Sequence, residues 1–459
     1  MHALALSLLF ATAIDARALE SLLDDVMPRE MKQRQIPGAA FILVQDGRVV
    51  LAKGYGLANV EEQVAVDPAK TIFPIASITK VFTATAVVQL ADRGALDLNA
   101  DVNRYLKHVR VPDTYKQPVT AAHLLTHSAG FDELRGRLVQ SAEKVQPLDR
   151  FLATRLIRIR PPGELTAYSS FGAALAGQLV EDVSGMPFER YLACNLFTPL
   201  GMHRTQITLP DALLADAAIG YEADEAQKLV TIPWERYHTP PASSISSTAS
   251  DMGRFMLAML AEGKGILSAR AAHEMLSQQR TMHPRVPGFG YGWQMSDTNG
   301  RRIVEHGGDI GGFSSLMTLL PDDATGFFLV NHREGIDLRE PVRKAILDRF
   351  FPRETPLPDP VANKADAAKH KRLEGTYRGS IWCHTCEFDP DRVRDVKVAA
   401  NDDGTLTIWD SKWIEVAPLF FRGADGKGRV GFHEDAQGNI TAMTGGSWLT
   451  FERLRTIAR

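Results

Sequence analysis

The sequence predicts a mixed α/β (α+β) fold, in which one antiparallel sheet is flanked by helices and carries a helical subdomain, followed by a small all-β domain. Three observations support this prediction. A helix and a hairpin open the main domain, whereas strands and a helix close it, so both ends can contribute to one sheet. The stretch between them is typical of helices and loops. Beyond a segment rich in proline, alanine and charge, short strands separated by turns replace the helices.

Length, charge and cysteine count restrict the number of domains, the class of partner and the use of disulfides. The chain has 459 residues, which is too long for one ordinary core and indicates two or three domains. Its 52 basic and 55 acidic residues give a net charge of -3, which favours neither nucleic acid nor an anionic surface as a partner. Three cysteines are too few for a disulfide framework. The sequence does not indicate an oligomeric state.

The N-terminal segment has the apolar character of a secretion signal. Residues 3–14 form a short apolar run that ends in small residues and is too short to span a bilayer. We expect residues 1–17 to be a signal peptide, although no basic residue precedes the run, and we expect a periplasmic or secreted protein. The alternative is that the run begins the first helix and the protein is cytoplasmic. No later stretch has the length of a membrane span.

The main domain is expected to cover residues 18–351. Its first helix is predicted at 18–34, with Pro28 as a possible kink or break. Asp46-Gly47 is a strong hairpin signal between two apolar strands. The remaining elements are expected as strands at 39–44, 48–53, 314–320 and 326–331, and as helices at 148–158, 171–183 and 338–351. An active site is expected in the seam between the sheet and the inserted helices.

The C-terminal part has a different pattern. Residues 352–370 are predicted to be a linker, and residues 371–459 a β-barrel or β-sandwich. Turn signals containing glycine separate the apolar runs. The strands are expected at 375–377, 396–398, 406–409, 430–432, 440–443 and 448–454.

A serine and a lysine stand at the start of a predicted helix, in Ser77-Ile78-Thr79-Lys80. Apolar residues follow with a helical period until Gly94 ends the helix. Lys80 therefore lies one turn after Ser77, on the same face. The unpaired N–H groups of a helix start can stabilise the product of serine attack, and an adjacent lysine can take the serine proton. Taken alone, this tetrad is more often a helix cap with a solvated lysine.

Two further stretches contain residues that could take part in catalysis or substrate binding. Tyr168 stands in Tyr168-Ser169-Ser170, just ahead of a predicted helix. His306-Gly307-Gly308-Asp309 is rich in glycine at the start of a strand, which permits the close approach of another backbone or a ligand. Each stretch alone also fits a structural role, as an anchor or as a tight turn.

In this order, the motifs Ser-x-x-Lys, Tyr-x-Ser and His-x-Gly resemble those of the serine β-lactamase and penicillin-binding-protein-like superfamily. The resemblance is to its class C β-lactamase, D-alanyl-D-alanine carboxypeptidase and family VIII esterase group, and it covers roughly residues 18–351. Further segments that look like family landmarks are 36–38, 46–47, 54–56, 124–130, 199–202 and 291–293.

The resemblance implies a role for each motif. Ser77 would form an acyl-enzyme, and Lys80 and Tyr168 would share its proton. The backbone N–H groups of Ser77 and Asp309 would form the oxyanion hole. It implies neither a metal nor a cofactor, and it implies an ester, peptide or β-lactam substrate. Substrate contacts would come from Ser170, His306 and Gly308.

Two residues depart from the family pattern. Ser170 replaces the usual asparagine of the second motif, and His306 replaces the lysine of the third, so a fixed positive charge is missing near neutral pH. Both changes weaken the case for β-lactams, which present an amide and a carboxylate. We therefore expect a metal-independent serine hydrolase for esters or D-amino-acid peptides. The alternatives are a β-lactamase and a catalytically weak scaffold or peptidoglycan-binding protein.

Two other segments imitate catalytic motifs. Residues 126–130 look like a nucleophile elbow, but no strand precedes them, so we interpret His127 and Ser128 as structural. Cys383 and Cys386 have the spacing of a redox motif inside an all-β module. A local disulfide or a spare thiol pair is favoured there over catalysis or zinc binding.

Overall fold

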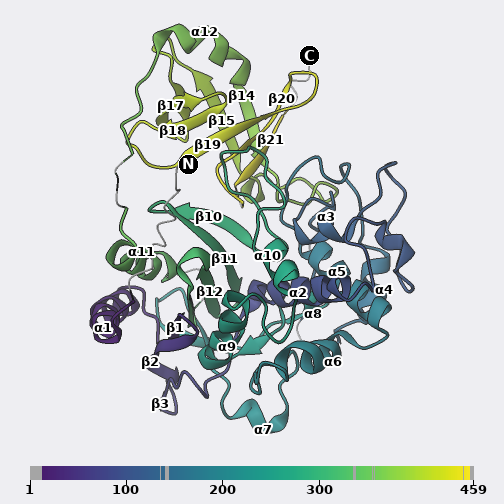
Figure 1. The fold of residues 1–459 in the computed structure, drawn as a ribbon, viewed down its shortest axis with the longest axis vertical. Helices are drawn as coiled ribbons and strands as arrows, with labels where there is room; N and C mark the ends of the chain where they lie inside the picture. Colours follow the sequence, from purple (N-terminus) through teal and green to yellow (C-terminus); the bar gives the residue numbers. More distant parts are fainter. Residues whose placement is uncertain are drawn as a thin grey trace, which may run out of the picture.

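A computed structural model describes residues 13–134, 136–139, 144–333, 338–353, 355, 357–447 and 449–454, with the backbone alone at 138–139. It confirms the predicted fold class: one antiparallel sheet with helices on both faces, and an all-β domain after it (Figure 1). Most of the predicted signal peptide, residues 1–12, lies outside the described residues. Among the helices that the structure describes, none combines the length and the apolar character needed to cross a membrane.

The central sheet joins the two ends of the main domain. Its seven strands lie in the order β10-β11-β12-β13-β1-β2-β3. β1 (Gly38–Gln45) pairs antiparallel with both β2 (Arg48–Asn59) and β13 (Thr325–Asn331), which brings the predicted terminal segments together. The other strands are β3 (Val64–Ala65), β10 (Gln294–Thr298), β11 (Arg301–Ile310) and β12 (Phe313–Leu320).

Both faces of β1 are buried, which explains its unbroken apolar sequence. Ala39, Phe41 and Leu43 belong to a core shared with α1 (Ala16–Gln33) and α11 (Arg339–Phe350). The alternate residues of β1 face the larger core of the helical region. Pro28 lies inside α1 and does not divide it, so a break there is wrong.

The helical region covers the other face of the sheet. Its long helices are α2 (Thr79–Asp92), α5 (Ser170–Ser184) and α9 (Ala249–Leu260), and α2 is buried along almost its whole length. The helix predicted at 148–158 is shorter, because α4 (Leu148–Ala153) is capped at Thr154 and Arg158 instead donates to three backbone carbonyls. Shorter helices include α3 (Ala121–Leu125), α6 (Phe188–Leu192), α7 (Asp211–Leu214), α8 (Pro240–Ser243) and α10 (Ala269–Met275).

The C-terminal domain is a closed eight-stranded barrel rather than a sandwich. The sequence did not predict β17 (Ser411–Ala417) and β18 (Phe420–Gly423). The hairpin leading into β17 turns on Trp409 and Asp410, whose φ angles of 50° and 57° are those of a tight turn without glycine. The other strands are β14 (Gly375–Gly379), β15 (Asp395–Ala400), β16 (Leu406–Ile408), β19 (Arg429–Glu434), β20 (Ile440–Thr444) and β21 (Thr450–Arg453).

The predicted linker is irregular only in its first part. Its second part forms a short helical turn and α12 (Ala367–His370). His370 is buried, and its ring centroid lies 5.1 Å from that of Phe421 in the barrel. The end of the linker therefore packs as part of the barrel domain.

Candidate active site

Ser77 lies at the seam between the sheet and the helices. β4 (Phe73–Pro74) pairs with β9 (Ser246–Ser247), and the 3-10 helix Ala76–Ile78 then leads into α2. Ala76 has a φ of 50°, a left-handed conformation that is uncommon for a residue with a Cβ. Such a strained turn directly before a helix fixes the direction of the next side chain, which is half-buried Ser77.

Lys80 is buried directly behind Ser77. Its Nζ lies 3.1 Å from Oγ of Ser77 and donates a hydrogen bond of 2.8 Å to the backbone carbonyl of Ala242. Burial lowers the pKa of Lys80 well below its usual range, and the nearby Arg137 lowers this pKa further, against the opposing effect of Glu133. A lysine with a lowered pKa is deprotonated at a lower pH, and a neutral amine can accept the proton of Ser77.

Tyr168 completes this group from the loop before α5. The Lys80 Nζ lies 4.8 Å from the centroid of the Tyr168 ring, and the ring of His127 packs 4.3 Å away. Burial raises the pKa of Tyr168, whereas the hydrogen bond of its hydroxyl with Ser77 acts in the opposite direction. Tyr168 therefore stays protonated near neutral pH and can pass on a proton.

The segment that resembles a nucleophile elbow lies behind Tyr168. His127 accepts a hydrogen bond of 3.1 Å at Nδ1 from the backbone N–H of Ser169. Burial lowers the pKa of His127 well below its usual value. Ser128 is buried, and its Oγ lies 2.9 Å from Oγ1 of Thr126. These contacts hold the Tyr168 loop in place and leave Ser128 without access to a substrate.

β11 approaches Ser77 closely because Gly308 has no side chain. A Cβ at Gly308 would lie 2.5 Å from the carbonyl oxygen of Ile75 and 2.8 Å from the backbone nitrogen of Ser77. The next residue, Asp309, lies opposite Ser314, one step from the pair Ile310–Phe313 that closes the two-residue turn. In an antiparallel pair alternate residues direct their N–H groups away from the partner strand. By this alternation the N–H of Asp309 points to the edge of β11.

A groove of about 570 Å³ opens beside Ser77. One of its walls is the end of β11, and another is α11. Arg339 donates a hydrogen bond of 2.9 Å to Asp309, and Arg343 donates one of 3.0 Å to Glu305. The sequence did not indicate these two guanidinium groups, because they come from a helix that shares no motif with Ser77.

The structure places two of the three residues predicted to contact substrate, His306 and Ser170, outside the lining of the groove. His306 is fully buried, with its ring centroid 6.2 Å from that of Tyr168, and does not line the groove. Burial and the neighbouring Lys80 lower the pKa of His306 to about 3, so the ring is neutral. Ser170 is buried as the first residue of α5, and its backbone N–H donates to both carboxylate oxygens of Glu133, at 3.0 and 3.2 Å.

Glu133 is a residue that the sequence analysis missed. Its carboxylate lies 3.6 Å from Nε of Arg137 and next to the N-terminus of α5. Burial raises the pKa of Glu133, and the positive charges of Arg137 and Lys80 counteract that rise. Glu133 stands in a loop outside every motif, so its place beside Lys80 is decided by tertiary packing.

A second cavity of about 490 Å³ borders the Ser77 segment. Its lining includes Pro74, three residues before Ser77, and Ser243, which follows the residue whose carbonyl accepts the Lys80 hydrogen bond. Much of its wall is apolar, with side chains of Ile207, Leu209, Leu214, Ile219, Trp234 and Ile310. Its polar residues include Glu235, which accepts a hydrogen bond of 2.9 Å from the N–H of Gly311.

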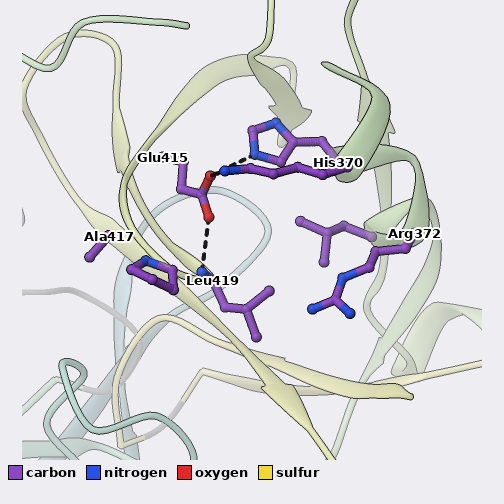
Figure 2. Close-up of a pocket in the computed structure, with 8 residues that line it drawn as sticks. His370, Arg372, Glu415, Ala417 and Leu419 are labelled. Atoms are coloured by element: carbon purple, nitrogen blue, oxygen red, sulfur yellow. Dashed lines mark hydrogen bonds and ion pairs between the residues drawn. The ribbon is translucent and has the colours of Figure 1, made fainter. Parts of the chain in front are cut away.

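A further cavity of about 520 Å³ lies in the barrel domain and shares no residue with the groove (Figure 2). Within the described ranges, Asp366, His370 and Glu415 are the one group in which three ligand atoms of metal-binding type come within 4.8 Å. The Lys369 ammonium lies 2.9 Å from the Asp366 carboxylate and 2.6 Å from that of Glu415. This ammonium already supplies the positive charge, so we assign no metal site here.

Known proteins are similar to this chain over nearly its whole length or over the main domain alone. The chain is 26% identical over 314 residues to "Protein flp" of Staphylococcus aureus, covering 67% of this chain and 62% of that protein. Its fold is similar to that of an octameric penicillin-binding protein homologue from Pyrococcus abyssi, with a TM-score of 0.65, 22% identity and coverage of 95% of this chain and 100% of that one. EstCE1, "a hydrolase with promiscuous acyltransferase activity", is similar over 73% of this chain and 100% of its own, with a TM-score of 0.63 and 20% identity. Residues 23–349 match the family described as Beta-lactamase, and the chain belongs to this family.

Proposed function

We propose that the protein is a serine hydrolase that forms an acyl-enzyme on Ser77 and acts on esters or on D-amino-acid peptides and amides. The observation that carries this proposal is the buried Lys80, whose Nζ lies 3.1 Å from Oγ of Ser77. Membership of a family of serine hydrolases supports it. The proposed step uses only side chains and backbone groups, so we propose a metal-independent enzyme.

The geometry supports a two-stage reaction. Lys80, with Tyr168 beside it, takes the proton of Ser77 as Oγ attacks the substrate carbonyl carbon. The N–H groups of Ser77 and Asp309 stabilise the resulting oxyanion. Tyr168 or Lys80 then gives the proton to the leaving group as its bond to the carbonyl carbon breaks, and the acyl group stays on Oγ as an ester. Water attacks that ester in the second stage, with the same groups as base and acid, and frees Ser77.

The groove that Ser77 lines and the apolar cavity that Pro74 lines would accept different parts of a substrate. The apolar cavity near Pro74 and Trp234 fits an apolar acyl group or side chain. The groove along α11 holds Arg339 and fits a polar or anionic group. Arg339 thus supplies the positive charge that the neutral His306 does not. This guanidinium favours a second candidate function, β-lactam hydrolysis, because a β-lactam brings a carboxylate.

A substrate panel tests the proposal. Hydrolysis of p-nitrophenyl esters of increasing acyl length, D-alanyl peptides and a chromogenic cephalosporin is measured, and intact mass with peptide mapping locates the acyl adduct. We expect an adduct on Ser77 and a higher kcat/KM for esters or D-amino-acid substrates than for the cephalosporin. Ser128→Ala serves as the matched control and should keep its activity. A higher kcat/KM for the cephalosporin would favour a β-lactamase, and no turnover with any substrate would favour a scaffold.

A further inference from the structure

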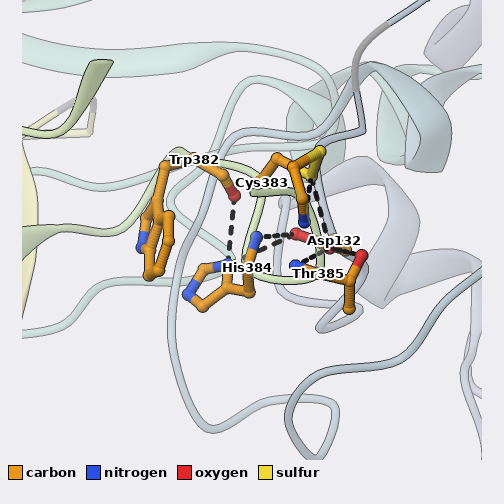
Figure 3. The surroundings of a disulfide bond; sticks show 6 residues. Asp132, Trp382, Cys383, His384 and Thr385 are labelled. Atoms are coloured by element: carbon orange, nitrogen blue, oxygen red, sulfur yellow. Dashed lines mark hydrogen bonds and ion pairs between the residues drawn. A yellow bond between two sulfur atoms is a disulfide. The ribbon is translucent and has the colours of Figure 1, made fainter. Parts of the chain in front are cut away.

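A buried carboxylate of the main domain is held by a loop of the barrel domain (Figure 3). Asp132 is fully buried. Its carboxylate accepts hydrogen bonds from the backbone N–H groups of His384, at 2.8 Å, and Thr385, at 3.0 Å. It also accepts one of 2.7 Å from the Thr385 hydroxyl. All three donors lie between two cysteines of the barrel domain that form a disulfide, Cys383 and Cys386.

The disulfide closes a four-residue ring that presents these donors together. The Cα atoms of Cys383 and Cys386 lie 5.4 Å apart, and the N–H of Cys386 points back to Sγ of Cys383 at 3.1 Å. Successive N–H groups in such a turn form a concave site for an anion, and the covalent closure limits the other conformations of the ring. Burial alone raises the pKa of Asp132, but the hydrogen bonds from His384 and Thr385 outweigh it and lower this pKa to about 2. At neutral pH the Asp132 carboxylate is therefore charged and hydrogen-bonded to the Cys383–Cys386 loop.

The barrel domain also holds the segment that leads to Tyr168. The hydroxyl of Ser380 donates a hydrogen bond of 3.3 Å to the carbonyl of Thr166, two residues before Tyr168. Arg160 donates one of 2.7 Å to Glu452 in β21. Leu165 packs in a small buried cluster with Ala442 of the barrel and Met282. Two loops of the main domain thus depend on the same face of the barrel.

Asp132 is followed in the chain by Glu133, whose carboxylate lies next to the active site. The Glu133 carboxylate accepts the N–H of Ser170, two residues after Tyr168, and acts electrostatically on Lys80 and Tyr168. A displacement of Asp132 must move Glu133 as well, because only one peptide unit separates them. The contact path therefore runs from the disulfide ring through Asp132 and Glu133 to the turn that carries Tyr168.

We infer that the Cys383–Cys386 loop of the barrel is a positioning element of the active site, with Asp132 as the positioning residue that it holds. This inference rests on the proposed function for its effect on turnover, whereas its effect on structure is independent of that function. Opening the disulfide frees the ring, releases Asp132 and loosens the Tyr168 turn. The barrel domain then contributes to catalysis without supplying a group that touches the substrate.

The inference is tested on the full chain with its disulfide intact and after reduction. Dithiothreitol, a dithiol, breaks the S–S bond, leaves two cysteine thiols and is itself oxidised to a cyclic disulfide. Asp132→Asn tests the same contact without a redox reagent, since an amide has one oxygen acceptor and its NH₂ group faces N–H donors. Cys194→Ser controls for the free, exposed cysteine. Asp297→Asn controls for domain docking, because it removes a different contact, the ion pair with Arg429 of the barrel.

We expect reduction and Asp132→Asn each to lower kcat by about tenfold or more while KM changes little, since the groove along α11 is not part of the contact path. Hydrogen exchange should become about tenfold faster in residues 129–134 and 166–170, and remain unchanged in β1. The two controls should show neither effect.

Unchanged exchange in both segments, with reduction proven by the gain of two hydrogens in the intact mass, would overturn the inference. An equal loss of kcat in Asp297→Asn would also overturn it, because domain docking in general would then explain the effect. If the wild type hydrolyses nothing, the proposed function fails, and hydrogen exchange alone still decides whether the ring holds the two loops.

Discussion

The two sides of the Ser77 site differ in burial and in charge. On one side Lys80 is buried and Tyr168 is half-buried, and desolvation is the largest influence on the pKa of both. On the other side the groove between β11 and α11 is open and charged. There, Arg339 and Asp309 keep 24% and 43% of their side chains exposed while they pair with each other.

In the proposed reaction, this difference assigns proton transfer to one side of Ser77 and substrate recognition to the other. A lysine can act as a base near neutral pH where burial or a nearby positive charge lowers its pKa, and Lys80 has both. A charged wall exposed to solvent is screened and adaptable, so it can discriminate between substrates at little cost to stability. We therefore expect substitutions on the buried side to change kcat strongly, and substitutions in the groove to change KM mildly.

The largest effect is expected at Ser77. Ser77→Ala removes the proposed nucleophile and should lower kcat by about 10⁴-fold or more. The midpoint of thermal unfolding should stay close to that of the wild type, because Ser77 is only half-buried. Activity and melting are measured on the same preparation. A fully active Ser77→Ala protein would contradict the assignment of the nucleophile.

A smaller effect is expected at Tyr168. Tyr168→Phe keeps the ring against Lys80 and His127 but removes the hydroxyl, and should lower kcat by about 100-fold, the scale of general acid–base catalysis. Steady-state kinetics with an ester and with an amide measure it, and the amide should suffer more because its leaving group needs a proton. Wild-type kcat for both substrates would leave Tyr168 with a structural role only.

The pH dependence of activity should follow the titration of Lys80 and not that of His306. Lys80 must be neutral to act as a base, so activity is present above its pKa and is lost as pH falls through it, by about tenfold per pH unit. Because burial lowers this pKa, the ascending limb should lie well below the usual lysine value of about 10.4. His306→Gln should leave the limb in place, since the His306 pKa of about 3 keeps the ring neutral over this range. A limb that disappears in His306→Gln would assign the titration to His306.

The smallest effect is expected in the groove. Arg339→Gln should raise KM by about fivefold for a substrate with a carboxylate, the scale of a partly exposed ion pair, and leave KM for a neutral ester unchanged. Arg302→Gln is the matched control, because Arg302 also forms an exposed ion pair on β11 but does not line the groove. Equal changes for both substrates would show that Arg339 acts on the fold of the groove rather than on charge.

The sequence by itself determined the features that depend on neighbouring residues. Ser77 and Lys80 come together because three positions at a helix start span one turn. Asp46 and Gly47 turn the first hairpin because both adopt positive φ angles, 50° and 76°, that this residue pair tolerates. Alternation and turn signals were sufficient to indicate a β domain at the C-terminus, and apolar runs at both ends of the main domain were sufficient to indicate a shared sheet.

Only the tertiary structure decided which polar groups surround these features. The burial of His306, the place of Glu133 beside Lys80, and the Arg339 wall of the groove each depend on elements that are distant along the chain. The contact between Asp132 and the Cys383–Cys386 loop spans about half of the sequence. Hydrogen bonds and pKa shifts depend on distance in space and on the exclusion of water, and a periodic pattern along the chain contains neither quantity.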